Sequence, residues 1–309
     1  MTEPARPTPV ILDTDIGSDI DDTWALAMML KCPELDVRMV STCTNDTVAR
    51  ARIVAKLLET AGRTDIPVAV GTNFHNNRYD RQEAWVAGYE LADYPGPVHE
   101  DGVDAIIRTI MDSPKPVTLV CIGPLPNIGE ALRRQPAIAG NARFVGMHGS
   151  VRRGYGNKPE ISAECNVVNH TPDCQQAFTA AWDMTITPLD TCGLVRLDGE
   201  HYQAIRHSGD PLLMALMDNY RIWLEAINGR RESFETNSSV LFDTVAVHLA
   251  HTTHHLVMER LPIRVTDDGY TVIDEQAGKP MQVATQWADL EAFREELVRR
   301  LTSPTVVSA

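Results

Sequence analysis

The first half of this chain alternates short apolar runs with longer helical stretches, and this alternation limits the possible folds more than any other feature. The apolar runs have the length of strands and are rich in valine, and each precedes a stretch with helical character. Such alternation predicts a doubly wound α/β fold, with a mainly parallel sheet covered by helices on both faces. The expected strands are 10–12, 37–42, 68–70, 117–121 and 144–147, and the expected helices are 23–30, 48–61, 103–111 and 128–134.

The second half continues the same alternation. We expect a helix from Thr171 to about Trp182, a strand at 184–188, and helices at 211–227, 240–250 and 288–301. No low-complexity linker or internal repeat divides the chain into halves of contrasting composition. Since 309 residues can bury one large core, we expect a single domain over residues 1–309.

Composition excludes several classes of partner. The formal net charge of -14 argues against binding of nucleic acid, which depends largely on lysine and arginine, so a small ligand is expected. The N-terminus has no apolar segment typical of secretion, and no apolar run approaches the length of a membrane span. The six cysteines show no CxxC spacing and indicate reduced core residues. These features favour the cytoplasm and no membrane association.

An acidic cluster follows the first expected strand. Five aspartates occur within ten residues, directly before an apolar helix: Asp13, Asp15, Asp19, Asp21 and Asp22. Acids at this turn face the crevice where open α/β sheets bind ligands, and oxygen ligands at flexible spacing favour calcium over zinc. Helix capping by Asp19 and the helix dipole explain part of the cluster. They do not explain Asp13 and Asp15, whose burial at a strand end would be costly without a partner.

Several short motifs, in order along the chain, together resemble the inosine-uridine-preferring nucleoside hydrolase family. The family begins with a DxD pair, a glycine and a DD pair that opens a helix, and later has a histidine with an Asp-Gly segment, a GPLTN segment, an EFN segment and a late acid. Each motif is weak alone, but the combined order and spacing are specific. The matching segments are Asp13 to Gly17 with Asp21-Asp22, Val98 to Gly102, Ile122 to Asn127, Ala163 to Asn166, and Phe242-Asp243.

The resemblance implies a calcium-dependent enzyme that hydrolyses the N-glycosidic bond of ribonucleosides. Transferred by motif, the metal ligands are Asp15, Asp22, Asp243 and the backbone carbonyl of Ile122, all oxygen donors as calcium prefers. Asp15 is also the expected general base, since it would lie beside a water acidified by the metal. Asp21 is expected to hold a ribose hydroxyl.

The family's other sugar-binding positions correspond to Asp46, Asn157, Glu164 and Asn166. An oxocarbenium-like sugar needs such acceptors around the ribose. Asp46 could instead cap the helix that follows it, and Asn157 could instead serve a turn. Glu164 and Asn166 are two residues apart and would point to the same side if the segment is extended, which would favour a shared ligand.

The sequence departs from the family pattern in ways that affect the substrate. Two extra residues precede the acidic pair, so Asp19 could take the role of Asp21. The histidine that donates a proton to the leaving base is replaced by Phe242, which suggests a purine stacked on this ring or merely a core phenylalanine. His99 and His148 are alternative acids, although a lone histidine is commonly structural. Trp85 could supply a second stacking face or pack under a loop.

Two alternatives remain open at this point. A phosphatase of the haloacid dehalogenase type also has a DxD pair after its first strand, with magnesium as its usual ion, but it explains neither Phe242-Asp243 nor the Ile122 to Asn127 segment. A non-catalytic nucleoside-binding protein would keep the pocket without turnover. The family resemblance also suggests a homodimer or homotetramer.

Overall fold

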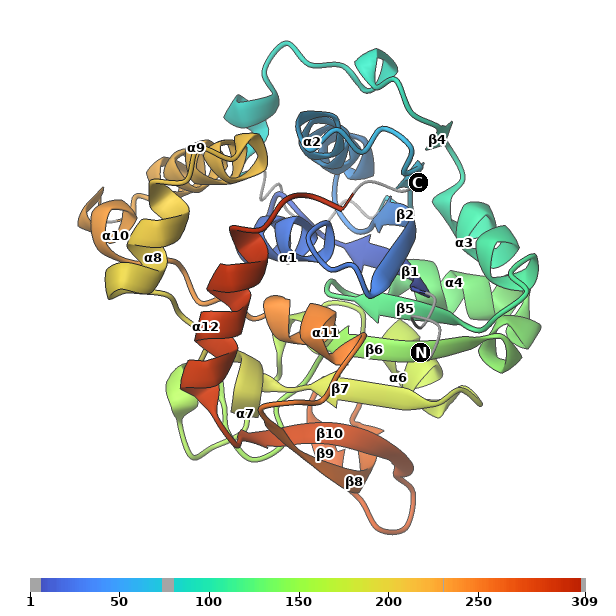
Figure 1. Ribbon diagram of the computed structural model, residues 1–309. Helices are drawn as coiled ribbons and strands as arrows, with labels where there is room; N and C mark the ends of the chain where they lie inside the picture. The colour runs from blue at the N-terminus through green and yellow to red at the C-terminus, as the bar shows by residue number, and fades with distance from the viewer. Residues whose placement is uncertain (1–6, 74–80, 230, 307–309) are drawn as a thin grey trace, which may run out of the picture.

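The computed structural model describes residues 7–73, 81–229 and 231–306 and has one ten-stranded sheet (Figure 1). The strand order is β4-β3-β2-β1-β5-β6-β7-β10-β8-β9, and all pairs are parallel except those of β8 with β10 and with β9. The strands are β1 (Thr8–Thr14), β2 (Leu35–Thr42), β3 (Val68–Val70), β4 (Val98–His99), β5 (Val117–Cys121), β6 (Ala142–Met147), β7 (Met184–Thr187), β8 (Leu256–Val265), β9 (Thr271–Ile273) and β10 (Lys279–Trp287).

The central strand β1 is apolar because both of its faces are covered. Val10 and Leu12 belong to one hydrophobic core, whereas Ile11 between them belongs to a second core on the opposite face. The two neighbours of β1 are β2 and β5, from which the strand order continues in opposite directions. The loops beyond the carboxyl end of β1 therefore meet at a switch point, where α/β sheets bind ligands.

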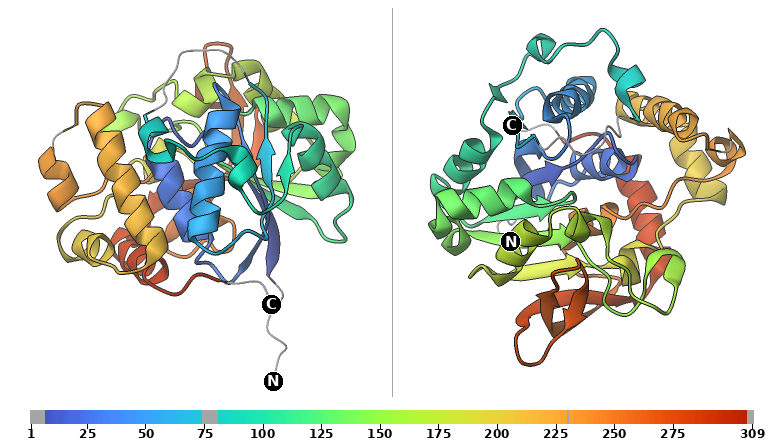
Figure 2. Two further views of the ribbon diagram at one scale, coloured as in Figure 1. Left: turned by 90° about the horizontal axis from the view of Figure 1, so that it is seen from above. Right: turned by 180° about the vertical axis from the view of Figure 1, so that it is seen from behind.

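Two layers of helices flank the sheet, as the view from above in Figure 2 shows. One layer holds α1 (Asp21–Met29), α2 (Thr47–Thr60), α9 (Pro211–Ala226), α11 (Thr244–Leu249) and α12 (Leu290–Leu301). The other holds α3 (Gly102–Met111), α4 (Pro126–Arg134) and α6 (Thr171–Thr179). The shorter helices are α5 (Cys165–Val168), α7 (Leu189–Cys192), α8 (Gly199–Arg206) and α10 (Arg231–Thr236), with 3₁₀ turns at Glu83–Val86, Leu91–Asp93, Pro136–Gly140 and Tyr155–Asn157.

The fold confirms the predicted α/β class and the parallel order of the first strands. Alternation alone did not reveal β8, β9 and β10, which complete the sheet at the edge opposite β4 (Figure 1). Pro262 lies within β8, opposite Pro280 of β10. Proline is uncommon inside strands, so these residues argue against a strand when the sequence is read alone. The helix expected at 240–250 is α11 and begins later, at Thr244, because Asp243 occupies its N-cap position. Within the described part of the chain, no helix has the length and apolar character needed to cross a membrane.

Candidate active site

A cavity of about 410 Å³ opens at the carboxyl ends of the central strands. The loops after β1, β2, β5 and β6 meet there, joined by the segment before α11 and by Arg81. The register aligns Thr14 of β1 with Thr42 of β2, which places the ends of these strands together. The lining residues are Asp15, Ser18, Asp19, Asp21, Asp22, Thr44, Asn45, Arg81, Ile122, Pro124, Met147, Tyr155, Glu164, Cys165, Asn166, Asn169, His170, Phe242 and Asp243.

The centre of the cavity holds three buried carboxyl groups from two helices. Asp21 and Asp22 open α1, and Asp243 is the N-cap residue of α11. One oxygen of each carboxyl group lies within 4.8 Å of the others, in the arrangement of a metal site. Thr14 at the end of β1 donates a hydrogen bond to Asp22, and the Asp21 and Asp243 side chains are hydrogen-bonded to each other. Two of the predicted metal ligands, Asp22 and Asp243, therefore do meet, although 220 residues separate them. The third member of the group is Asp21, which was predicted to hold a ribose hydroxyl, and the predicted ligand Asp15 lines the same cavity.

Burial gives these acids unusual protonation behaviour. Loss of hydration, with the neighbouring Asp19 charge, raises the pKa of Asp21 to about 8. Burial likewise raises the pKa values of Asp15, Asp22 and Asp243, and repulsion among these acids adds to the shift. Such a group of carboxylates ionises together only with a positive partner. Because every donor in the cluster is oxygen, the residues fit a hard divalent cation such as calcium.

The buried Arg50 holds the acidic loop in place from α2. Its guanidinium donates to the backbone carbonyls of Asp15 and Ile16, and to the hydroxyl of Ser18 at 2.8 Å. Its Nε donates to the carbonyl of Thr44 at 3.0 Å, which ties the loop after β1 to the loop after β2. Sequence reasoning missed this residue, because an arginine within a helix 35 residues downstream gives no sign of the loop that it contacts.

A glycine allows the loop after β5 to approach Asp15. A Cβ atom at Gly123 would lie 2.8 Å from the Asp15 nitrogen and 2.9 Å from its Oδ1, closer than real contacts allow. The preceding Ile122 lines the cavity, and its carbonyl accepts a hydrogen bond from Nδ2 of Asn166 at 3.0 Å. The predicted Ile122 carbonyl is therefore brought to the same cavity as Asp15.

Glu164 and Asn166 lie at the start of α5 and also line the cavity. The Glu164 carboxylate accepts hydrogen bonds from the backbone N–H groups of Gly149 at 3.0 Å and of Asn166 at 2.8 Å. Burial nevertheless raises the pKa of Glu164 to about 7. Asn166 also donates to the carbonyl of Met147, so both side chains are fixed by the backbone around the cavity.

Aromatic side chains form an apolar part of the same cavity. Phe242 and Tyr155 pack edge to face, with ring centroids 6.3 Å apart and an interplanar angle of 79°. Phe242 directly precedes the acid Asp243, so the apolar and acidic parts of the cavity adjoin. The sequence did not indicate Tyr155, although this residue lies in the same loop as the predicted sugar ligand Asn157.

The structure does not bring two predicted sugar ligands, Asp46 and Asn157, into the cavity. Asp46 is exposed and caps α2, where its carboxylate accepts from the N–H of Ala49 at 3.0 Å. The adjacent Asn45, in the left-handed region with φ of 49°, lines the cavity instead. Asn157 is also exposed and left-handed, in a turn closed by a hydrogen bond between Gly154 and Lys158. Helix capping and turn formation explain these residues.

The alternative acids and the second stacking residue also lie outside the cavity. His99 is half-buried in β4, where it pairs with β3 near the sheet edge. His148 is fully buried behind Gly123, whose carbonyl is 3.2 Å from its Nε2, and burial lowers its pKa to about 3. Trp85 packs in the core, with the Lys56 ammonium over its ring. Asp19 does line the cavity, but its carboxylate is largely exposed and pairs with Arg81 at 2.9 Å.

Further lining residues were not predicted from the sequence. Cys165 lies within the Glu164 to Asn166 motif, and Asn169 and His170 follow one helical turn later. Their spacing from Glu164 is the one signal that could have suggested them. Arg81 lies far from any motif and gives no such signal.

Comparison with known proteins agrees with this architecture. The solved structure of a plant nucleoside hydrolase, PpNRh1, superposes with a TM-score of 0.82 at 24% identity, covering 96% of this chain and all of that one. A purine-preferring ribonucleoside hydrolase from Gardnerella vaginalis gives a TM-score of 0.76 at 21% identity, covering 96% of this chain and 98% of that one. At these identities the likeness concerns the fold.

Sequence similarity identifies the family. The non-specific ribonucleoside hydrolase RihC of Salmonella paratyphi B is 31% identical over 224 residues, which cover 69% of this chain and 71% of the relative. The family model described as inosine-uridine preferring nucleoside hydrolase matches residues 10–295. The chain therefore belongs to the inosine-uridine preferring nucleoside hydrolase family and is a ribonucleoside N-glycosyl hydrolase.

Proposed function

We propose that this hydrolase depends on calcium and prefers purine ribonucleosides, from which it releases the free base and ribose. The observation that carries the proposal is the cavity itself, in which a buried acidic cluster adjoins the aromatic pair of Phe242 and Tyr155. The acids suit a hard cation and a sugar that becomes positively charged. The aromatic rings suit the flat face of a base.

Calcium would be held by Asp15, Asp22, Asp243 and the carbonyl of Ile122, all of which line the cavity. The cation would neutralise the acids, orient the sugar and make water more acidic. The hydrogen bond from Thr14 to Asp22 fixes one of these carboxylates, and the Arg50 contacts fix the backbone around Asp15. Bound calcium would thus supply the positive charge that balances the buried carboxylates.

Asp15 is proposed as the general base that takes a proton from the attacking water. Asp15 is half-buried directly after β1, and Arg50 holds its backbone, so the position of the base is restricted. Asp21, Glu164 and Asn166 would bind ribose hydroxyls, joined by Asn45 in the position first expected for Asp46. Negative charge around the ribose would stabilise the oxocarbenium-like transition state.

The proposed purine preference depends on Phe242. This ring replaces the histidine expected as proton donor, and its edge-to-face contact with Tyr155 leaves an aromatic wall in the cavity. A purine has two fused rings and therefore offers a larger stacking surface than the single ring of a pyrimidine. A purine gains more free energy from stacking for this reason. The larger base is therefore the better fit for this wall.

Family membership sets aside the haloacid dehalogenase alternative and the non-catalytic nucleoside-binding alternative. Three features stay predictions: the single domain over residues 1–309, a homodimer or homotetramer, and the cytoplasmic location. Sedimentation of the purified protein would measure its state of assembly.

Release of free base from purine and pyrimidine ribonucleosides tests the proposal. With calcium we expect faster release from purine nucleosides, and chelation should abolish it. Asp15→Asn should lower kcat by roughly 10²- to 10⁴-fold, as expected for loss of a general base. Asp104→Asn, on the exposed surface of α3, is the control and should leave kcat unchanged. Full activity in the presence of a chelator, or equal rates for both base classes, would contradict the corresponding part of the proposal.

A further inference from the structure

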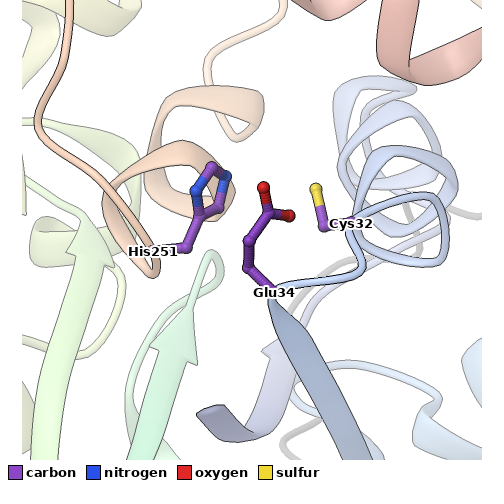
Figure 3. A group of neighbouring side chains, drawn as sticks. All are labelled: Cys32, Glu34 and His251. Carbon is purple, nitrogen blue, oxygen red and sulfur yellow. The ribbon is translucent and has the colours of Figure 1, made fainter. Parts of the chain in front are cut away.

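A second cluster of metal-ligating side chains lies at the opposite end of the sheet from the cavity. Cys32 and Glu34 lie in the turn before β2, at the amino ends of the strands, and His251 follows α11. Figure 3 shows the three side chains converging from these segments. One ligand atom from each lies within 4.8 Å of the others. The site proposed for calcium contains none of these residues.

The donor set and its accessibility suit a different ion from calcium. Sulfur, imidazole nitrogen and carboxylate oxygen together are the ligands of zinc, which commonly leaves its fourth position to water. Cys32 is buried, whereas the Glu34 side chain is 43% exposed and gives access from solvent. Nε2 of His251 is buried and has no hydrogen-bond partner among the described residues, although unpaired buried polar atoms are costly.

Without a metal ion, Arg300 of α12 supplies the positive charge at this cluster. It donates two hydrogen bonds of 2.9 Å to Glu34 and lies 3.6 Å from the Cys32 sulfur. It is also bonded to Glu296 at 2.7 Å, so it keeps a partner if Glu34 turns to a metal. With Cys32 as a thiolate, the three negative charges of Cys32, Glu34 and Glu296 would balance the positive charges of Arg300 and a divalent ion. Burial raises the pKa of the Cys32 thiol to about 12, so the ion has to displace the thiol proton into solvent.

We propose that Cys32, Glu34 and His251 form a zinc site that joins the ends of α1 and α11. The two helices pack against each other, and each begins at residues that line the cavity. Asp21 and Asp22 open α1, and Asp243 occupies the N-cap position of α11, while Cys32 and His251 follow the other ends of the same helices. Zinc here would cross-link the helices that carry the acids of the active site.

Cobalt absorption tests the site, because a bond from cobalt to a thiolate gives a charge-transfer band that oxygen ligands do not give. The full chain is reduced, saturated with calcium and titrated with Co²⁺, and then with Zn²⁺. We expect the band to appear and Zn²⁺ to remove it. Cys32→Ser should abolish the band, and His251→Gln and Glu34→Gln should each weaken zinc affinity at least about tenfold.

Cys165→Ser is the matched control, since Cys165 is the thiol that lines the candidate active-site cavity. This variant should keep the band unchanged. The proposal is overturned if the wild type gives no band, if Cys32→Ser keeps it, or if Cys165→Ser loses it. Circular dichroism of each metal-free variant confirms folding, and the half-exposed Glu34→Gln gives an answer if Cys32→Ser fails to fold.

Discussion

At the scale of single residues, the proposed base preference depends on Phe242. Its ring lines the cavity and contacts Tyr155, and it also packs against the core of the α1 and α11 layer. The same side chain therefore lines the cavity and packs against the core, which the sequence presented as two competing interpretations.

Phe242→Ala should raise KM for purine nucleosides roughly tenfold, since stacking of a base on an aromatic ring is worth about 1–3 kcal/mol. Phe242→Tyr keeps the ring and is the control. Steady-state kinetics on a purine and a pyrimidine nucleoside measure the difference. Equal losses for both bases would show that Phe242 does not select the base, and a thermal melt separates this result from unfolding.

Asn45 and Asp46 are neighbours with different surroundings, one in the cavity and one at the cap of α2. Asn45→Ala should lower kcat/KM by at least about tenfold because a sugar contact is lost. Asp46→Ala should leave kcat/KM unchanged but lower the free energy of unfolding by about 1 kcal/mol, as loss of a helix cap does. Kinetics and urea unfolding of both variants provide the measurement. The reverse pattern would restore Asp46 as the sugar ligand.

At the scale of elements, Asn127 at the start of α4 joins three strand ends beneath the cavity. Its Nδ2 donates to Asp13 at 2.8 Å and to the carbonyl of Thr42 at 3.0 Å, and its Oδ1 accepts from the N–H of Thr72 at 2.7 Å. Gly71 makes the approach possible, because a Cβ atom there would lie 2.1 Å from the Thr42 carbonyl oxygen. One side chain thus connects α4 with β1, β2 and the segment after β3.

Asn127→Ala should lower the free energy of unfolding by about 3 kcal/mol, because it leaves several buried polar groups without partners. Glu130→Ala on the same helix removes only surface ion pairs with Arg133 and Arg134 and should cost less than about 1 kcal/mol. Urea unfolding compares the two variants. Equal losses of unfolding free energy in the two variants would mean that the buried hydrogen bonds of Asn127 stabilise the fold no more than the surface ion pairs of Glu130.

At the scale of the whole molecule, the buried acids predict that stability depends on pH and on the proposed calcium ion. Burial raises the pKa of Asp21 from 3.8 to about 8, and those of Asp13 and Glu164 to about 7. Without metal, the folded state therefore binds more protons than the unfolded state, so stability falls as pH rises through these values. His148 and His248, held neutral by burial, act in the opposite direction only below about pH 6.5.

Between pH 6.5 and 8, the metal-free protein should lose about 3 kcal/mol of its free energy of unfolding. Calcium should flatten this dependence, because the ion already stabilises the charged carboxylates. Urea unfolding at several pH values, with calcium and with a chelator, measures both slopes. Stability that rises with pH in the chelator would contradict the assignment of these groups as buried and metal-free.

The sequence by itself determined the fold class, because alternating strands and helices can bury their apolar faces in few other ways. It also determined the family, because ordered motifs such as Asp13 to Gly17 and Phe242-Asp243 are specific together. The acids that meet in the cavity were identified in the same way. Each of them lies directly at the end of a strand or the start of a helix, where local pattern defines its position.

Tertiary structure alone decided which side chains beside those motifs face the cavity. Asn45 replaced Asp46, and Tyr155 replaced Asn157, because a left-handed backbone or a tight turn aims neighbouring side chains in different directions. Arg50, Arg81 and the cluster of Cys32, Glu34 and His251 are long-range contacts between segments that no local pattern relates. The strands β8 to β10 likewise depended on pairing across the sheet, since strand formation depends on its partners more than on its own sequence.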